Sequence, residues 1–103
     1  MLMGKVAGTV VSTQKDPGLE GYKIQIVQIV DFDMKKTSNY VVAVDAIGAG
    51  YGEMVIVVQG SSARLTAQTT NKPVDAAIIA IVDLVEVEGK LRYRKFEHAE
   101  AAR

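Results

Sequence analysis

The chain has 103 residues, of which 49% are hydrophobic, and its 12 basic side chains balance 12 acidic ones. This length fits one domain with a modest core, and the zero net charge lacks the basic excess that non-specific nucleic-acid binding needs. The absence of cysteine excludes disulfides and thiolate chemistry and fits a reducing compartment such as the cytoplasm. The start of the chain lacks a signal-peptide pattern, and no apolar run approaches the ~20 residues of a membrane span. We therefore expect neither nucleic acid nor a membrane as a partner.

The first third of the chain predicts two strands joined by a turn. Alternation in Leu2–Thr13 indicates a strand, and one of its faces carries Val6, Gly8 and Val10. A turn follows at Lys15–Gly18, where proline fixes φ and glycine accepts positive φ. Tyr22–Asp31 is the second predicted strand, and its apolar residues change parity near Ile26–Val27. That change indicates either a bulge at this point or a strand that is buried on both faces.

A glycine-rich stretch, Asp45–Glu53, lies between two apolar runs and organises the middle of the sequence. We interpret Asp33–Asn39 as a mobile polar loop and Tyr40–Ile47 as the third strand. The fourth strand, Glu53–Gln59, is apolar without alternation, so both of its faces should be covered. A neighbouring subunit is one candidate for the second cover. The glycines predict a tight hairpin between these two strands, which we interpret as a packing or pore element.

The last part of the chain predicts a short helix followed by long strands. Gly60–Thr66 begins with good N-cap residues and predicts one or two helical turns. Ile78–Val87 predicts a long apolar strand that turns into a last strand, Lys90–Phe96. Because this last arm would have little to cover in a lone barrel, we expect it to pack partly on a neighbour. Residues 97–103, which contain the single histidine, His98, are expected to fray.

These elements predict a mainly β fold with a single domain over residues 1–96 and a tail over residues 97–103. We expect a small five-stranded barrel of the oligonucleotide-binding (OB) type, because a closed barrel leaves no exposed sheet edge. One short helix and a C-terminal hairpin arm complete it. The helix follows the fourth strand, whereas OB barrels usually carry a helix between the third and fourth strands.

Catalysis has little support in the sequence. The only histidine lies in the tail, which argues against a histidine-based triad or metal site, and no carboxylates have the spacing of a metal loop. We expect Arg64 to form an ion pair with one of the carboxylates at strand ends, which are Asp45, Glu53, Asp75 and Asp83. No cofactor, metal or enzymatic activity is expected. An OB-like binding module for single-stranded nucleic acid or a small ligand is the alternative function.

Several stretches follow one another in a specific order: Gly4–Thr13, Val42–Asp45, Gly48–Glu53, Gly60–Arg64, Pro73–Ile78 and Ile81–Asp83. Each stretch is a weak signal alone. In this order and in a chain of this length, they resemble the EutN/CcmL family of bacterial microcompartment vertex proteins. The resemblance covers nearly the whole chain and leaves out only the last residues.

The resemblance implies a barrel that assembles as a homopentamer at the corners of a polyhedral protein shell in the bacterial cytoplasm. The facets of such a shell are hexameric shell proteins, and because hexagons alone tile a plane, closure needs fivefold corners. Where subunits converge, small residues are needed. The candidate pore or interface residues are therefore Gly48, Ala49, Gly50, Gly52, Glu53, Ser61, Ser62 and Arg64. At Gly50 we expect a backbone conformation that a β-branched residue would not tolerate.

Overall fold

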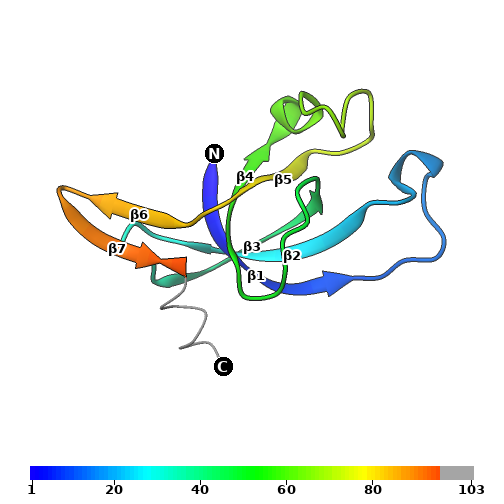
Figure 1. Cartoon of the computed structure of the whole chain (residues 1–103). Coiled ribbons are helices and arrows are strands. Elements are labelled where there is room, and N and C mark those ends of the chain that lie inside the picture. The colour runs from blue at the N-terminus through cyan, green and yellow to red at the C-terminus, as the bar shows by residue number, and fades with distance from the viewer. Residues whose placement is uncertain (96–103) are drawn as a thin grey trace.

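A closed barrel of five strands forms the body of the protein in the computed structural model, which describes residues 1–95. The order around the barrel is β1-β2-β3-β5-β4 (Figure 1). These strands are β1 (Leu2–Val10), β2 (Lys23–Val30), β3 (Lys36–Asp45), β4 (Met54–Gln59) and β5 (Ala76–Ile81). A hairpin of β6 (Leu84–Val87) and β7 (Lys90–Arg94) projects from the barrel. The expectations for Phe96, the tail 97–103 and His98 lie outside the described residues.

The predicted fold class is confirmed: the chain is mainly β, with a five-stranded barrel and a C-terminal hairpin. Between Met1 and Arg94, its helical parts are two short 3₁₀ segments, η1 (Pro17–Leu19) and η2 (Gly60–Arg64). The second of them confirms the short helix predicted between the fourth and fifth strands. Within residues 1–95, no helix is long and apolar enough to cross a membrane.

The connection between β3 and β4 is not the predicted hairpin, because these strands do not pair with each other. β3 pairs with β2 and, in parallel, with β5, while β4 pairs antiparallel with β1 and β5. Since β5 lies between them, the glycine-rich stretch crosses the barrel instead of turning tightly. β3 also begins at Lys36, so only the first part of the predicted loop Asp33–Asn39 is a turn.

A bulge lies in β1 and changes which side chains face the interior. The pairing of β1 with β2 shifts between Val6 and Gly8, which makes Ala7 the extra residue. The bulge predicted near Ile26–Val27 thus occurs at this level of the barrel, but in the partner strand. Beyond the bulge the inward parity changes, and the hydroxyl of Thr9 reaches inward. The prediction that Val6, Gly8 and Val10 lie on one face of the strand is therefore wrong.

β4 lies at the junction of three buried clusters, all of them formed by its own chain. Val55 and Val57 belong to the central core, Val58 packs beneath η2, and Met54 packs beneath the hairpin. All four side chains are at most 9% exposed in the single chain. The second cover of β4 is therefore the same chain, and no neighbouring subunit is needed to explain its unbroken apolar run.

The β6–β7 hairpin also packs on its own barrel. Tyr93 is 3% exposed and contacts a cluster that includes Val30, Met54 and Val82. The expectation that the arm has little to cover in a lone barrel is therefore wrong. The predicted long strand Ile78–Val87 is interrupted at Val82 and Asp83, where the chain leaves the barrel and starts the arm.

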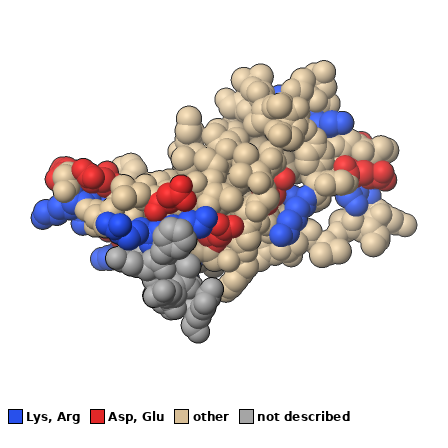
Figure 2. All heavy atoms as spheres, in the orientation of Figure 1, with Lys and Arg blue, Asp and Glu red and all other residues tan. Residues whose placement is uncertain are grey.

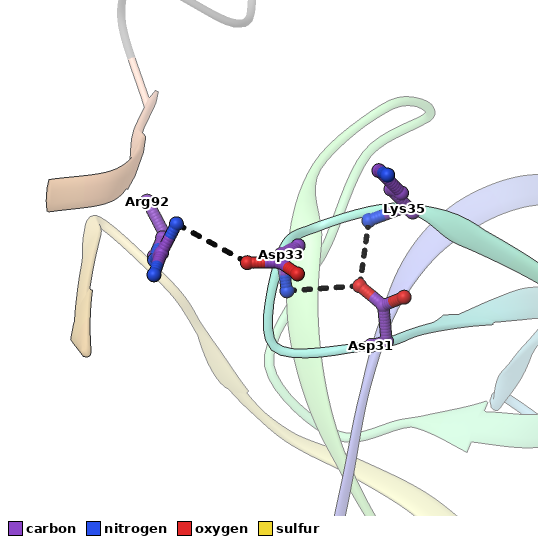
Figure 3. A network of polar contacts seen from close by, with 4 residues as sticks. All are labelled: Asp31, Asp33, Lys35 and Arg92. Atoms are coloured by element: carbon purple, nitrogen blue, oxygen red, sulfur yellow. Dashed lines mark hydrogen bonds and ion pairs between the residues drawn. The ribbon is translucent and has the colours of Figure 1, made fainter. Parts of the chain in front are cut away.

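A network of polar contacts holds the hairpin to the turn between β2 and β3 (Figure 3). The Asp31 carboxylate accepts the backbone N–H groups of Asp33 (2.8 Å) and Lys35 (3.0 Å), which fixes the turn. The Asp33 carboxylate in turn pairs with the Arg92 guanidinium at 3.2 Å. Together with buried Tyr93, this contact gives the projecting arm a defined direction.

Gly4 allows a close approach of β1 to β2, so adding a methyl group there should be costly. A Cβ at this position would lie 2.4 Å from Val27 Cγ1 and 2.7 Å from the Gln28 carbonyl oxygen. We predict that Gly4→Ala lowers the free energy of unfolding by about 1–3 kcal/mol, the usual cost of overpacking. Chemical denaturation at one fixed protein concentration measures it.

Gly8→Ala is the matched control in the same strand, because its Cβ would meet only Ile26 Cδ1 at an ordinary 3.7 Å. We expect little change in its unfolding midpoint. Equal losses in both variants would show that general strand propensity, and not close approach at Gly4, causes the effect.

Candidate subunit interface

The glycine loop, residues 45–53, is folded back on itself by two carboxylates. The Asp45 carboxylate accepts the N–H groups of Ile47 (2.9 Å) and Gly48 (2.8 Å). The Glu53 carboxylate accepts the N–H of Gly50 at 2.6 Å. Both carboxylates thus cap backbone amides of the loop, and they hold the loop in one conformation.

Positive φ occurs in this loop at Gly48 (93°) and Gly52 (84°), where side chains are disfavoured. Gly50 is not among the positive-φ residues, so the predicted backbone strain at Gly50 is wrong. A Cβ on Gly50 would instead approach the Glu53 carboxylate, to 3.3 Å from Oε1. The glycine at this position keeps that carboxylate close to the backbone amide.

A buried amide that the sequence reading missed fastens the loop to the barrel. Gln25 is 1% exposed, and its Nε2 donates to the Ala49 carbonyl oxygen at 2.8 Å and to Asp45 Oδ2 at 3.4 Å. Its Oε1 accepts the hydroxyl of Thr9 at 2.9 Å. The available signal was a single glutamine at an inward position between Ile24 and Ile26.

The two sides of the glycine loop have different surroundings. Ala49 is 1% exposed and packs in the central core of its own barrel, so its side chain has no surface for a neighbour. Gly48 is exposed, whereas Gly50 and Gly52 are half-buried. Backbone hydrogen bonds from Gly52 N–H to the Val6 carbonyl (2.9 Å) and from Val6 N–H to the Glu53 carbonyl (3.0 Å) seal the loop against β1.

Glu53 also connects the glycine loop to the end of β7. Its Oε2 lies 3.1 Å from Lys95 Nζ, and the same ammonium group lies 4.0 Å from Asp83 Oδ1. The hydrogen bond from the Gly50 amide lowers the pKa of Glu53 below the ordinary 4.5, and Lys95 acts in the same direction against the effect of burial. Conversely, the contact with Glu53 raises the pKa of Lys95.

The second set of candidate residues lies in η2. Ser61, Ser62 and Arg64 are all exposed, and Ala63 between them is fully buried. The Arg64 guanidinium donates to the Val74 carbonyl at 3.1 Å. It forms no ion pair with a carboxylate within residues 1–95, so the predicted pairing is wrong.

One subunit does not bring the two candidate sets together. Glu53 ends the glycine loop immediately before β4, and Gly60 starts η2 immediately after it. Six extended residues span about 20 Å, so these two points lie far apart on the subunit. Any contact between Gly52 or Glu53 and the η2 residues would have to join different subunits.

Within residues 1–95, no group of three or more histidine, aspartate or glutamate side chains could hold a metal ion. Among the described residues, the surroundings shift the pKa of Glu53, Lys95 and Tyr93. For the buried Tyr93, desolvation raises the pKa. These three groups stabilise the junction of barrel and arm, and they do not form a nucleophile–base pair.

Acid should weaken the junction through Glu53. Because its pKa is lower in the folded chain than in the unfolded one, the contact adds stability above the ordinary 4.5 and loses it as the pH falls through the folded-state pKa. We predict that Glu53→Gln lowers the free energy of unfolding by about 1 kcal/mol at pH 7 and that this difference between wild type and variant is smaller at pH 3. Denaturation at both pH values measures this.

Asp83→Asn is the matched control, because Asp83 is 84% exposed and its contact with Lys95 is long. Its effect should stay below about 0.5 kcal/mol at either pH. A Glu53→Gln penalty of equal size at both pH values would contradict the role of the charge.

Known proteins resemble this chain in sequence and in fold. A family model described as ethanolamine utilisation protein EutN/carboxysome matches residues 1–83. The carboxysome shell vertex protein CcmL of Synechococcus elongatus is 46% identical over 99 residues, which span 96% of this chain and 100% of the relative. The match ends at Asp83, so the β6–β7 hairpin follows the part that the family model covers.

Solved structures share both the sequence and the barrel. CcmL of Nostoc is 47% identical with a TM-score of 0.88, covering 92% of this chain and 100% of that chain. The GrpN pentameric microcompartment shell protein of Rhodospirillum rubrum is 46% identical with a TM-score of 0.77, covering 84% of this chain and 100% of that chain. These findings confirm the resemblance seen in the sequence motifs. The chain belongs to the EutN/CcmL family.

Proposed function

We propose that this chain is a structural subunit that forms homopentamers and closes the vertices of a bacterial microcompartment shell in the cytoplasm. The observation that carries the proposal is the likeness to the pentameric shell protein GrpN, whose entire solved chain is matched at 46% identity. The proposed partners are four further copies of the chain and the hexameric shell proteins that surround a vertex.

A ring needs two different faces on each subunit, one for each neighbour. The glycine loop and η2 present two separate rigid surfaces, and each carries a large apolar side chain in solvent. Tyr51 in the loop is 80% exposed and Leu65, directly after η2, is 82% exposed. In the proposed ring, a neighbour partly covers Leu65 and the ring of Tyr51. We therefore retain Gly48, Gly52, Ser61, Ser62 and Arg64 as interface candidates.

A catalytic role has no support, and we propose that the protein has no enzymatic activity and uses no cofactor. The full sequence has no cysteine and one histidine, and the perturbed groups have structural partners. The sequence has zero net charge, so it lacks the basic excess that binding to nucleic acid or to an anionic membrane surface would use. On the face drawn in Figure 2, positive and negative side chains are interspersed, most densely over the β6–β7 hairpin, and form no continuous basic track.

The proposed ring makes a direct prediction for solution mass. Native mass spectrometry should give five chains of 11.1 kDa each. Co-expression with hexameric shell proteins should then give closed shells, and omission of this chain should give open shells or sheets. A monomer that binds single-stranded oligonucleotides would instead favour the OB-like binding module.

A large side chain on η2 should split the ring if η2 lies at the subunit contact. We predict that Ser62→Trp weakens each contact by about 1–3 kcal/mol, because the indole has no cavity to enter. The loss repeats at every contact of the ring, so native mass spectrometry should show smaller species. Circular dichroism should still show the folded barrel, because Ser62 is exposed within the single chain.

Thr13→Trp is the matched control, since Thr13 is exposed in the β1–β2 connection and belongs to neither candidate surface. This variant should stay pentameric. A Ser62→Trp variant that remains fully pentameric would remove η2 from the interface.

A further inference from the structure

A small pocket on the outer side of β1, β2 and β3 collects positive charge. It has a volume of about 180 Å³ and is lined by Lys5, Ala7, Gln28, Lys36, Tyr51 and Gly52, with Val6 at its base. This volume accommodates several water molecules or one small polyatomic ion. The three strands do not form the pocket by themselves, because the glycine loop contributes Tyr51 and Gly52 to its lining.

Within the described part of the chain, the two lysines of this pocket form no ion pair. No aspartate or glutamate lines the pocket, and neither Lys5 nor Lys36 forms an ion pair with any residue between 1 and 95. By contrast, Arg92 and Lys95 elsewhere in the chain are paired with carboxylates. Lys5 is half-buried, so the barrel already orders part of the aliphatic stem that carries its ammonium group.

The pocket is built on fixed parts of the fold. Lys5 lies directly opposite Gln28 in the β1–β2 ladder, and Lys36 begins β3 opposite Val30. Gln28 donates its Nε2 to the Thr37 carbonyl at 3.0 Å, which orients its amide. The bulged residue Ala7 also lines the pocket, and the Gly52 N–H donates to the Val6 carbonyl of β1, which holds Tyr51 beside it.

We propose that this pocket binds a small dianionic oxyanion, with phosphate as the representative ligand. Two ammonium groups match two negative charges, and the phenol hydroxyl of Tyr51 adds a neutral hydrogen-bond donor. Two lysines are too few for tight nucleic-acid binding, which accumulates over roughly 6–10 phosphate contacts. The site would let a shell subunit sense or carry small anionic metabolites, in addition to its structural role.

Isothermal titration calorimetry with inorganic phosphate at pH 7.5 tests the proposal on the assembled protein, with ionic strength held constant by sodium chloride. We expect one saturable site per chain and weaker binding of acetate, which carries one charge. Lys5→Gln and Lys36→Gln should each weaken phosphate binding at least about tenfold, because each removes one charge-assisted contact.

Lys90→Gln is the control, since Lys90 is an exposed lysine near the turn of the hairpin and lies outside the pocket. Its phosphate affinity should equal that of the wild type. Absence of saturable binding, equal affinity for acetate, or full affinity in both pocket variants would each overturn the proposal. Lys36 is exposed, so Lys36→Gln should fold even if Lys5→Gln does not. Native mass spectrometry of the same samples reports the pentamer separately.

Discussion

The buried side chain of Gln25 is the contact on which the arrangement of the glycine loop depends. It lies among apolar residues and would cost about 1–3 kcal/mol if its polar atoms had no partners. Its hydrogen bonds to Thr9, Ala49 and Asp45 join β1, the loop and the end of β3. An amide in this position accepts only one loop conformation, because a shifted loop would leave a buried donor without an acceptor. A polar residue in the core therefore determines the shape of a surface.

That surface serves the proposed ring because it is ordered before any neighbour arrives. Ordering a loop at the moment of association reduces affinity, whereas a preorganised loop avoids that cost. The Asp45 and Glu53 carboxylates bind the loop amides, and Ala49 fixes its inner side in the core. The outer residues, Gly48 and Tyr51, are then presented in a defined position. The same preorganisation holds Tyr51 against the lysine pocket.

Local sequence patterns predict where the strands and the short helix lie better than they predict what each element pairs with or packs against. The alternation in β1 and β2 and the ordered motifs predict the barrel and its family, since they depend on neighbours in sequence. The short helix η2 also forms as predicted, although its N-cap is Gln59 and makes no side-chain capping hydrogen bond. Apolar patterns identify buried faces but do not say what covers them. This is why a neighbour was expected on β4 and on the last arm, although the same chain covers β4 and buries Tyr93 of the arm. Three features depend on contacts between residues that are distant in sequence. They are the insertion of β5 between β3 and β4, the contact of the Thr9 hydroxyl with Gln25 after the bulge at Ala7, and the carbonyl partner of Arg64.

The strand order has a consequence for synthesis on the ribosome. The first strand pairs with β4 through Leu2–Lys5 against Met54–Val57, and β5 completes the barrel only at Ile81. During translation, the nascent β1–β2–β3 sheet must wait with open edges until the last barrel strand leaves the exit tunnel. Such long-range pairing slows folding and leaves unpaired edges exposed to other nascent chains. Ribosomes that follow one another on the same message therefore bring unfinished sheets close together, with a risk of pairing between their open edges.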